Sequence, residues 1–242
     1  SPSRRAALLA SAARRDGLAG GLVKPQFGLV ALPVLAVAGL RAWRAGGGRP
    51  LLRAGIGMLV AYLVVALPLA LHPGRYLWLL ADAATRQPQT SLNAFNPWGL
   101  LVGFDLPDDP YVGIGSALLL VGLAGALAAL RHAWRRHTDL ATVLAAGALV
   151  ILAFYFLPTR VHERYLFPAM AVLAPFAVAE ASRLAAYVAL SGGFAVALLY
   201  ALLTTTSFTL PEPIAGAITS PAGVWTVGGV MIAGAAAWSW LL

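Results

Sequence analysis

The chain has no cysteine and few charged residues, and each shortage excludes a class of protein. Without cysteine it holds neither a disulfide framework nor a thiolate metal site. Charged residues make up 11% of the 242, against about 25% in soluble domains, whereas hydrophobic residues reach 60%. With a mean hydropathy of +0.80, this composition excludes an ordinary soluble domain and indicates an integral membrane protein.

Long apolar runs divide the chain into about seven membrane segments, each near the roughly 17–25 apolar residues that a spanning helix needs. Such lengths favour helices over the roughly 9–11-residue strands of a membrane barrel. The predicted fold is therefore an all-α polytopic transmembrane bundle, with residues 1–242 as a single transmembrane domain. The segments are 16–40, 55–71, 111–130, 140–157, 165–181, 184–206 and 222–242.

The first segment, 16–40, is unusual because Lys24 and Pro25 interrupt it. A hairpin bent at these two residues leaves most of the 17 lysines and arginines on one side of the membrane, which the positive-inside rule makes cytoplasmic. A single straight span is the alternative, but it would divide the basic residues between both sides. With the hairpin, Lys24 and the loops 71–110 and 159–165 share the extracytoplasmic face.

A polar cluster at 159–165 separates two of the apolar segments. Its sequence, Thr-Arg-Val-His-Glu-Arg-Tyr, places two arginines, a histidine and a glutamate at a membrane boundary, where charged residues mark functional sites by default. Arg164 is the strongest candidate for binding an anion, because a guanidinium makes two-pronged contacts with phosphate and keeps its charge. Its alternative role is to extend toward lipid headgroups.

Three motifs follow one another along the chain: Lys24-Pro25-Gln26, Ser-Leu-Asn-Ala-Phe-Asn-Pro-Trp at 91–98, and His-Glu-Arg-Tyr-Leu-Phe-Pro at 162–168. In order and separation they resemble bacterial multi-pass glycosyltransferases of the GT-C superfamily, similar to the second mannosyltransferase of GPI-anchor assembly. The resemblance covers essentially the whole chain, as the C-terminal portion of such an enzyme. It implies a sugar donor carried on polyprenyl phosphate. It also implies a catalytic aspartate in an outer loop upstream of Ser1, so no catalytic residue is assigned within the chain.

Ten residues are candidates for binding the substrate. They are Lys24, Gln26, Asn93, Asn96, Trp98, Arg160, His162, Glu163, Arg164 and Tyr165. The cations would receive the phosphate, the amides would bind sugar hydroxyls, and the indole would stack on a sugar ring. Each type has a plainer alternative: turn formation for the asparagines, an interfacial position for the aromatics and helix capping for the histidine. For the glutamate, neutralising a neighbouring arginine is the favoured role.

The sequence thus predicts a glycosyltransferase of the plasma (inner) membrane. It would move a mannose-like sugar from a polyprenyl-phosphate donor to a hydroxyl of a glycan, lipid or protein acceptor at the extracytoplasmic face. Membrane lipids surround it, and neither a nucleic-acid partner nor a cofactor beyond the donor is expected. A role for a divalent ion stays open, although no histidine pair has metal-ligand spacing. The alternatives are a transporter or flippase for a lipid-linked or anionic solute, and a non-catalytic membrane scaffold.

Overall fold

The computed structural model describes residues 87–134 and 140–241 of the chain. It also describes isolated positions nearer the N-terminus, namely Gly48, Arg49, Leu52, Arg53, Ile56, Trp78 and Asp82. The predicted hairpin at Lys24 and Pro25, together with Gln26, lies outside the described residues. The chain divides into two compact units, and residues 88–242 belong to the second, which is the unit described below.

The described residues are helical and contain no strand, which confirms the all-α prediction for this part of the chain. One turn of 3-10 helix, η1, precedes α9. The elements are α6 (Pro97–Leu101), α7 (Val112–Trp134), α8 (Leu140–Phe156), η1 (Glu163–Leu166), α9 (Phe167–Ala177), α10 (Ala181–Thr205), α11 (Glu212–Thr219) and α12 (Pro221–Leu241).

Three of these helices, α7, α10 and α12, are long and apolar enough to cross a membrane. The mean hydropathy of their most apolar windows is 2.1, 1.9 and 1.4. With 25 residues and about 1.5 Å of rise per residue, α10 extends further than the roughly 30 Å hydrocarbon core of a bilayer. The three helices coincide with predicted segments 111–130, 184–206 and 222–242. They indicate a membrane protein, while the count of seven segments is not confirmed by the described residues.

The predicted segment 140–157 corresponds to α8, which has 17 residues. The next predicted segment is shorter in the structure. The predicted segment 165–181 begins as η1 and continues as α9, whose 11 residues extend only about half of the bilayer core. Pro168 stands in the first turn of α9, where a missing N–H is tolerated, but Pro175 lies inside the helix and removes one of its hydrogen bonds. The helix ends soon afterwards.

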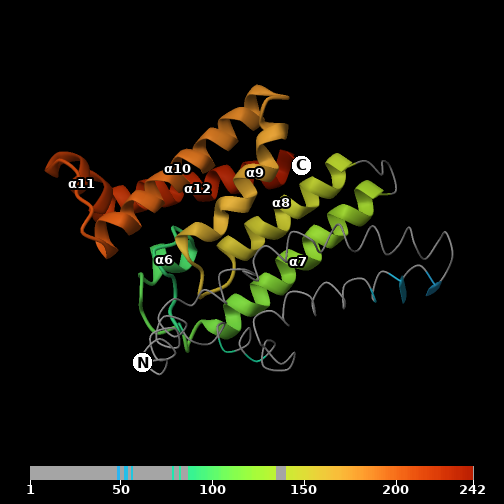
Figure 1. The fold of residues 1–242 in the computed structure, drawn as a ribbon, viewed down its shortest axis with the longest axis horizontal. Coiled ribbons are helices and arrows are strands. Elements are labelled where there is room, and N and C mark those ends of the chain that lie inside the picture. Colours follow the sequence, from blue (N-terminus) through green and yellow to red (C-terminus); the bar gives the residue numbers. More distant parts are fainter. Residues whose placement is uncertain are drawn as a thin grey trace, which may run out of the picture. The chain divides into compact units, whose positions relative to one another are not determined.

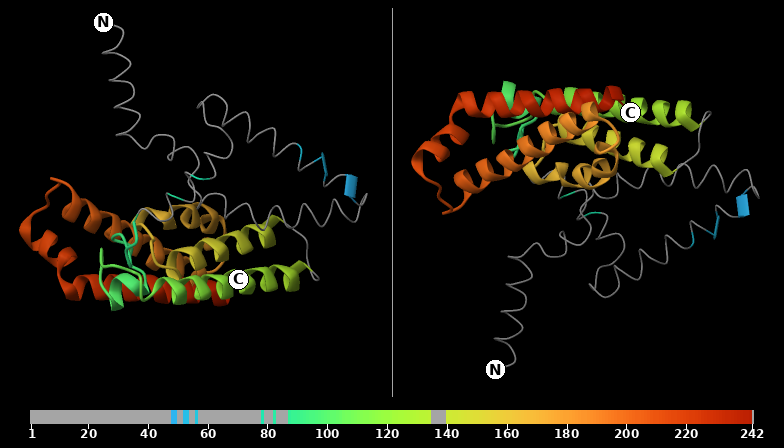
Figure 2. Two further views of the ribbon diagram at one scale, coloured as in Figure 1. Left: turned by 90° about the horizontal axis from the view of Figure 1, so that it is seen from below. Right: turned by 90° about the horizontal axis from the view of Figure 1, so that it is seen from above.

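The helices pack as two antiparallel pairs that α9 connects. Helix α10 runs along α12, α7 runs along α8, and α9 contacts both α8 and α10 (Figure 1). Gly193 permits the close approach of α10 and α12, because a β-carbon there would overlap Met231. Figure 2 shows α11 at one end of the α10–α12 pair, with the C-terminus toward the other end of α12.

Candidate functional site

Two loops meet at the end of the unit where α7 begins and α8 ends. The first loop, residues 87–111, contains the Asn/Trp motif, and the second, residues 157–166, contains the His-Glu-Arg-Tyr motif. Three backbone hydrogen bonds join these paired loops. The Arg160 N–H donates to the Gln89 carbonyl (3.0 Å). The Leu92 N–H donates to the Val161 carbonyl (2.9 Å), and the Leu92 carbonyl accepts from the Glu163 N–H (3.2 Å).

The pairing brings two distant motifs to one place. Leu92 and Asn93 both form isolated bridges with His162. Asn93 has a φ of 56°, in the left-handed region that asparagine tolerates better than most residues. The motifs at 91–98 and 162–168, which we expected to share one face of the membrane, therefore lie against each other in the structure. Lys24 and Gln26, which belong to the Lys-Pro-Gln motif, lie outside the described residues.

Asn96 and Trp98 use their polar groups to attach the first loop to the end of α8. Asn96 is fully buried and caps α6: its Oδ1 accepts from the Gly99 N–H at 2.9 Å. Its Nδ2 donates to the Tyr155 carbonyl at 3.2 Å. The Trp98 indole N–H donates to the Leu157 carbonyl at 2.7 Å. These contacts favour the plainer alternative, a structural role, for buried Asn96, whereas stacking of a sugar on the partly buried Trp98 ring stays a prediction.

Arg160 is paired with an acid that the sequence did not single out. Its Nε lies 2.8 Å from Asp108 Oδ2, and its Nη2 lies 3.1 Å from Asp108 Oδ1. The Thr159 hydroxyl donates to the same Oδ2 at 2.7 Å. Arg160 also has a φ of 64°, a backbone conformation that residues other than glycine rarely adopt. The contacts therefore hold Arg160 against a fully buried carboxylate.

The pKa values follow from this pairing. Burial alone would raise the pKa of Asp108, but hydrogen bonds from Arg160 and Thr159 outweigh it and hold the pKa below its ordinary value. The hydrogen bond to Asp108 raises the pKa of Arg160. Both groups are thus charged near neutral pH. The sequence carries no signal that distinguishes Asp108 from Asp105 and Asp109, which also precede the long apolar helix, because its partners lie 51 and 52 residues away.

The His-Glu-Arg-Tyr motif forms a small polar group around Glu163. Arg164 Nη1 lies 3.2 Å from Glu163 Oε1, and His162 Nδ1 lies 3.9 Å from Oε2. The side chain of Glu163 is 12% exposed and that of His162 is 15% exposed, whereas Arg164 is 49% exposed. Glu163 therefore has the neutralising contact that we expected of it, with Arg164 as the arginine.

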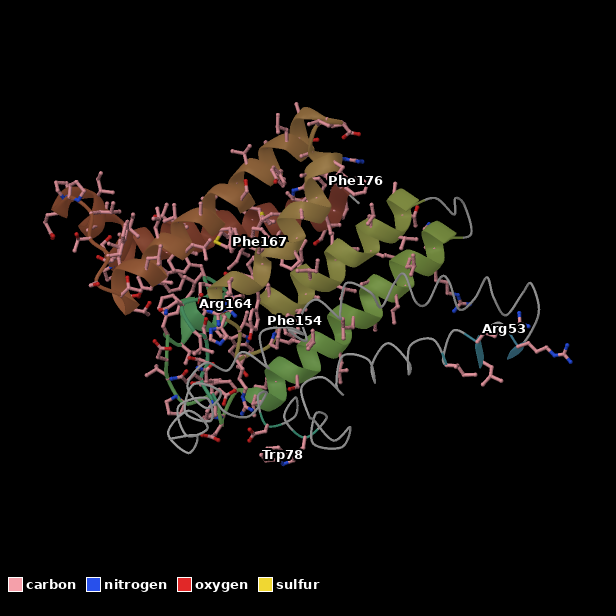
Figure 3. The ribbon with its side chains drawn as sticks, in the orientation of Figure 1. Arg53, Trp78, Phe154, Arg164, Phe167 and Phe176 are labelled. Atoms are coloured by element: carbon pink, nitrogen blue, oxygen red, sulfur yellow. The ribbon has the colours of Figure 1, made fainter. Side chains whose placement is uncertain are left out.

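Aromatic rings border this group. The Tyr165 ring centre lies 5.1 Å from that of His162 and 5.9 Å from that of Phe154, on which it stacks. In Figure 3, Arg164 lies at the paired loops, whereas Phe167 and Phe176 follow α9 away from them. Half-exposed Arg164 is thus presented beside a partly buried histidine, a carboxylate and a tyrosine.

Elsewhere in the unit, an apolar groove of about 480 Å³ lies between α7, α8 and α12. Its lining includes Gly125, Leu152 and Ile232, and it contains neither a charged residue nor any of the predicted site residues. Among the residues that the structure describes, no group of histidine, aspartate and glutamate is arranged to hold a metal ion. The polar chemistry of this unit is concentrated at the paired loops.

Comparison with known proteins gave no match to a protein family, to a curated protein or to a solved structure.

Proposed function

We propose that this chain is part of a glycosyltransferase of the inner membrane. The enzyme moves a mannose-like sugar from polyprenyl phosphate to an acceptor hydroxyl at the extracytoplasmic face. In this reaction the hydroxyl oxygen attacks the anomeric carbon, and the bond from that carbon to the phosphate oxygen breaks. The electron pair leaves on the phosphate, while the hydroxyl proton passes to a base. The resemblance implies that this base is an aspartate.

The observation that carries the proposal is the pairing of the two loops. Two motifs that suggested a phosphosugar enzyme lie about 70 residues apart in the sequence, yet Leu92 exchanges backbone hydrogen bonds with Val161 and Glu163. A donor substrate has a sugar and a phosphate close together, so its site needs polar groups of both kinds within a few ångströms. The bridge brings the backbones of Asn93 and His162 side by side, so that an amide-bearing and an imidazole-bearing residue are neighbours at the paired loops.

Arg164 is suited to receive the leaving phosphate. Its side chain is half exposed, so an incoming anion reaches it without displacing a packed neighbour. Its one-point contact with Glu163 leaves room for a two-pronged contact with phosphate. A cation held beside the departing oxygen stabilises the transition state more than the ground state, because negative charge grows there as the bond breaks. His162 lies against the same Glu163 carboxylate, with 3.9 Å between its Nδ1 and Oε2, and we assign to it a second hydrogen bond to the phosphate.

The test is a transfer assay on membranes that contain the complete protein, with polyprenyl-phosphate mannose, glucose and arabinose offered separately. We predict that Arg164→Ala lowers kcat/KM for the preferred donor by about 10²–10³-fold, the usual loss when one charge-stabilising donor is removed. Arg164→Lys should retain part of the activity, since it keeps the charge but not the fork of donors.

Arg131→Ala is the matched control, because Arg131 is an exposed arginine in the last turn of α7, at the end away from the paired loops. It should transfer sugar at the wild-type rate. Equal activity of Arg164→Ala and wild type at equal amounts of folded protein would refute the assignment of Arg164. Absence of transfer by the wild type with every donor would refute the proposed function.

A further inference from the structure

Asp108 is a fully buried carboxylate whose two oxygens accept three side-chain hydrogen bonds. Two of these come from one guanidinium, in the two-pronged geometry that makes arginine–carboxylate pairs strong and directional. A buried charge is tolerated only when it is paired and hydrogen-bonded in this way. The arrangement therefore fixes the position of the Arg160 side chain closely.

The backbone around both residues connects the two loops to α7. The Asp108 carbonyl accepts from the N–H groups of Tyr111 and Val112, at the start of α7, and its own N–H donates to Pro88 at 3.1 Å. Arg160, on the other loop, donates its N–H to Gln89. A left-handed backbone at Arg160 is unfavourable by itself, so it persists because the surrounding contacts hold it.

The polar site begins immediately after this connection. His162 follows Arg160 by two residues, and Arg164 follows by four. The path of the chain through 161–164 is set at one end by Arg160 and along its length by the two backbone bonds to Leu92. Releasing Arg160 from Asp108 would let this short segment move, and with it the group around Glu163.

We propose that Asp108 is a positioning residue for the candidate site. By holding Arg160, it fixes the 161–164 segment, so that His162 and Arg164 stand where the donor phosphate binds. Arg160 then serves to hold the segment in place. The sequence alone had suggested instead that it binds the phosphate. The catalytic consequence rests on the proposed function, whereas the effect on the segment does not.

The first experiment measures hydrogen exchange of the complete protein in detergent and is independent of activity. Asp108→Asn retains the shape of the side chain but removes its charge. We predict faster exchange in peptides that cover 159–164, where the N–H groups of Arg160 and Glu163 donate across to the first loop, and unchanged exchange in α10 and α12. Asp109→Asn is the control, because Asp109 is the exposed neighbour. Unchanged exchange at 159–164 in Asp108→Asn would overturn the proposal.

The second experiment measures donor kinetics, normalised to the amount of folded enzyme. If Asp108 acts by holding Arg160, then Asp108→Asn and Arg160→Ala each lower kcat at least tenfold. The double variant is then no worse than the poorer single variant. A purely structural role would reduce folded protein without changing kcat per folded molecule, and that result would overturn the proposal. So would independent losses that multiply in the double variant, because Arg160 would then contact the donor itself.

The two experiments separate the two proposals. A wild-type protein that transfers no sugar would refute the glycosyltransferase function, and the exchange measurement would still decide whether Asp108 holds the 159–164 segment. An active wild type with a normal Asp108→Asn variant would refute only the role of Asp108.

Discussion

Replacing Asn96 by alanine tests whether this residue of the Asn/Trp motif has a structural role or binds sugar. Asn96 is fully buried and makes two hydrogen bonds, one to each of two elements. Its Oδ1 caps α6 through the Gly99 N–H, and its Nδ2 satisfies the Tyr155 carbonyl in the last turn of α8. Alanine removes both bonds, so the Gly99 N–H and the Tyr155 carbonyl each lose the Asn96 side chain as a partner.

The expected cost follows from those two losses. Removing an asparagine N-cap costs about 0.5–2 kcal/mol. Losing the bond to the buried Tyr155 carbonyl adds about 1 kcal/mol. Asn96→Ala should therefore lower the free energy of unfolding by about 1.5–3 kcal/mol. In a protein of this size each kcal/mol lowers Tm by about 2–4 °C, so a decrease of about 3–12 °C is predicted.

The assay is thermal unfolding of the purified protein in detergent, followed by near-ultraviolet circular dichroism. Asn93→Gly is the matched control, because Asn93 belongs to the same segment and glycine accommodates its positive φ without strain. We predict a Tm close to that of the wild type for this control. An unchanged Tm for Asn96→Ala, combined with weaker donor binding, would contradict the scaffold role and favour direct sugar contact.

Two further predictions concern stability. Because the pKa of Asp108 in the folded protein lies below its ordinary value of 3.8, its pairing stabilises the protein above that pH, and the stabilisation is lost as the pH falls through the folded-state pKa. The Tm of the wild type should thus fall more steeply below about pH 4 than that of Asp108→Asn, and parallel curves would contradict this. Gly193→Leu should destabilise by about 1–3 kcal/mol, because its side chain would overlap Met231. Gly192→Leu should not, since a β-carbon there meets nothing within 4 Å; equal unfolding curves for the two leucine variants would contradict the close packing of α10 and α12.

The long helices could be predicted from the sequence because lipid leaves the backbone few choices. A spanning segment must pair its own N–H and C=O groups, so it forms a helix. Because that helix faces lipid, its sequence is a long apolar run, which is visible from hydropathy alone. This is why 184–206 and 222–242 correspond closely to α10 and α12. The short α11 was not predicted. Its start depends on Pro211 and Pro213, which set local backbone angles without any change in hydropathy.

The roles of single polar residues could not be predicted, because their partners lie far away in the sequence. Asn96 and Trp98 each bond a carbonyl 59 residues away, and Arg160 bonds a carboxylate 52 residues away. Residue type alone does not distinguish an asparagine that binds sugar from one that caps a helix. The contact between Glu163 and Arg164 is different, since adjacent residues of opposite charge already favoured it.

The most direct test of the central claim is the binding of a polyprenyl phosphate to the complete purified protein. The central claim is that the paired loops hold a lipid-linked phosphate through Arg164. We predict saturable binding that is lost in Arg164→Ala and kept in Arg131→Ala, measured by isothermal titration in detergent. Equal affinity of wild type and Arg164→Ala for the lipid phosphate would contradict the claim.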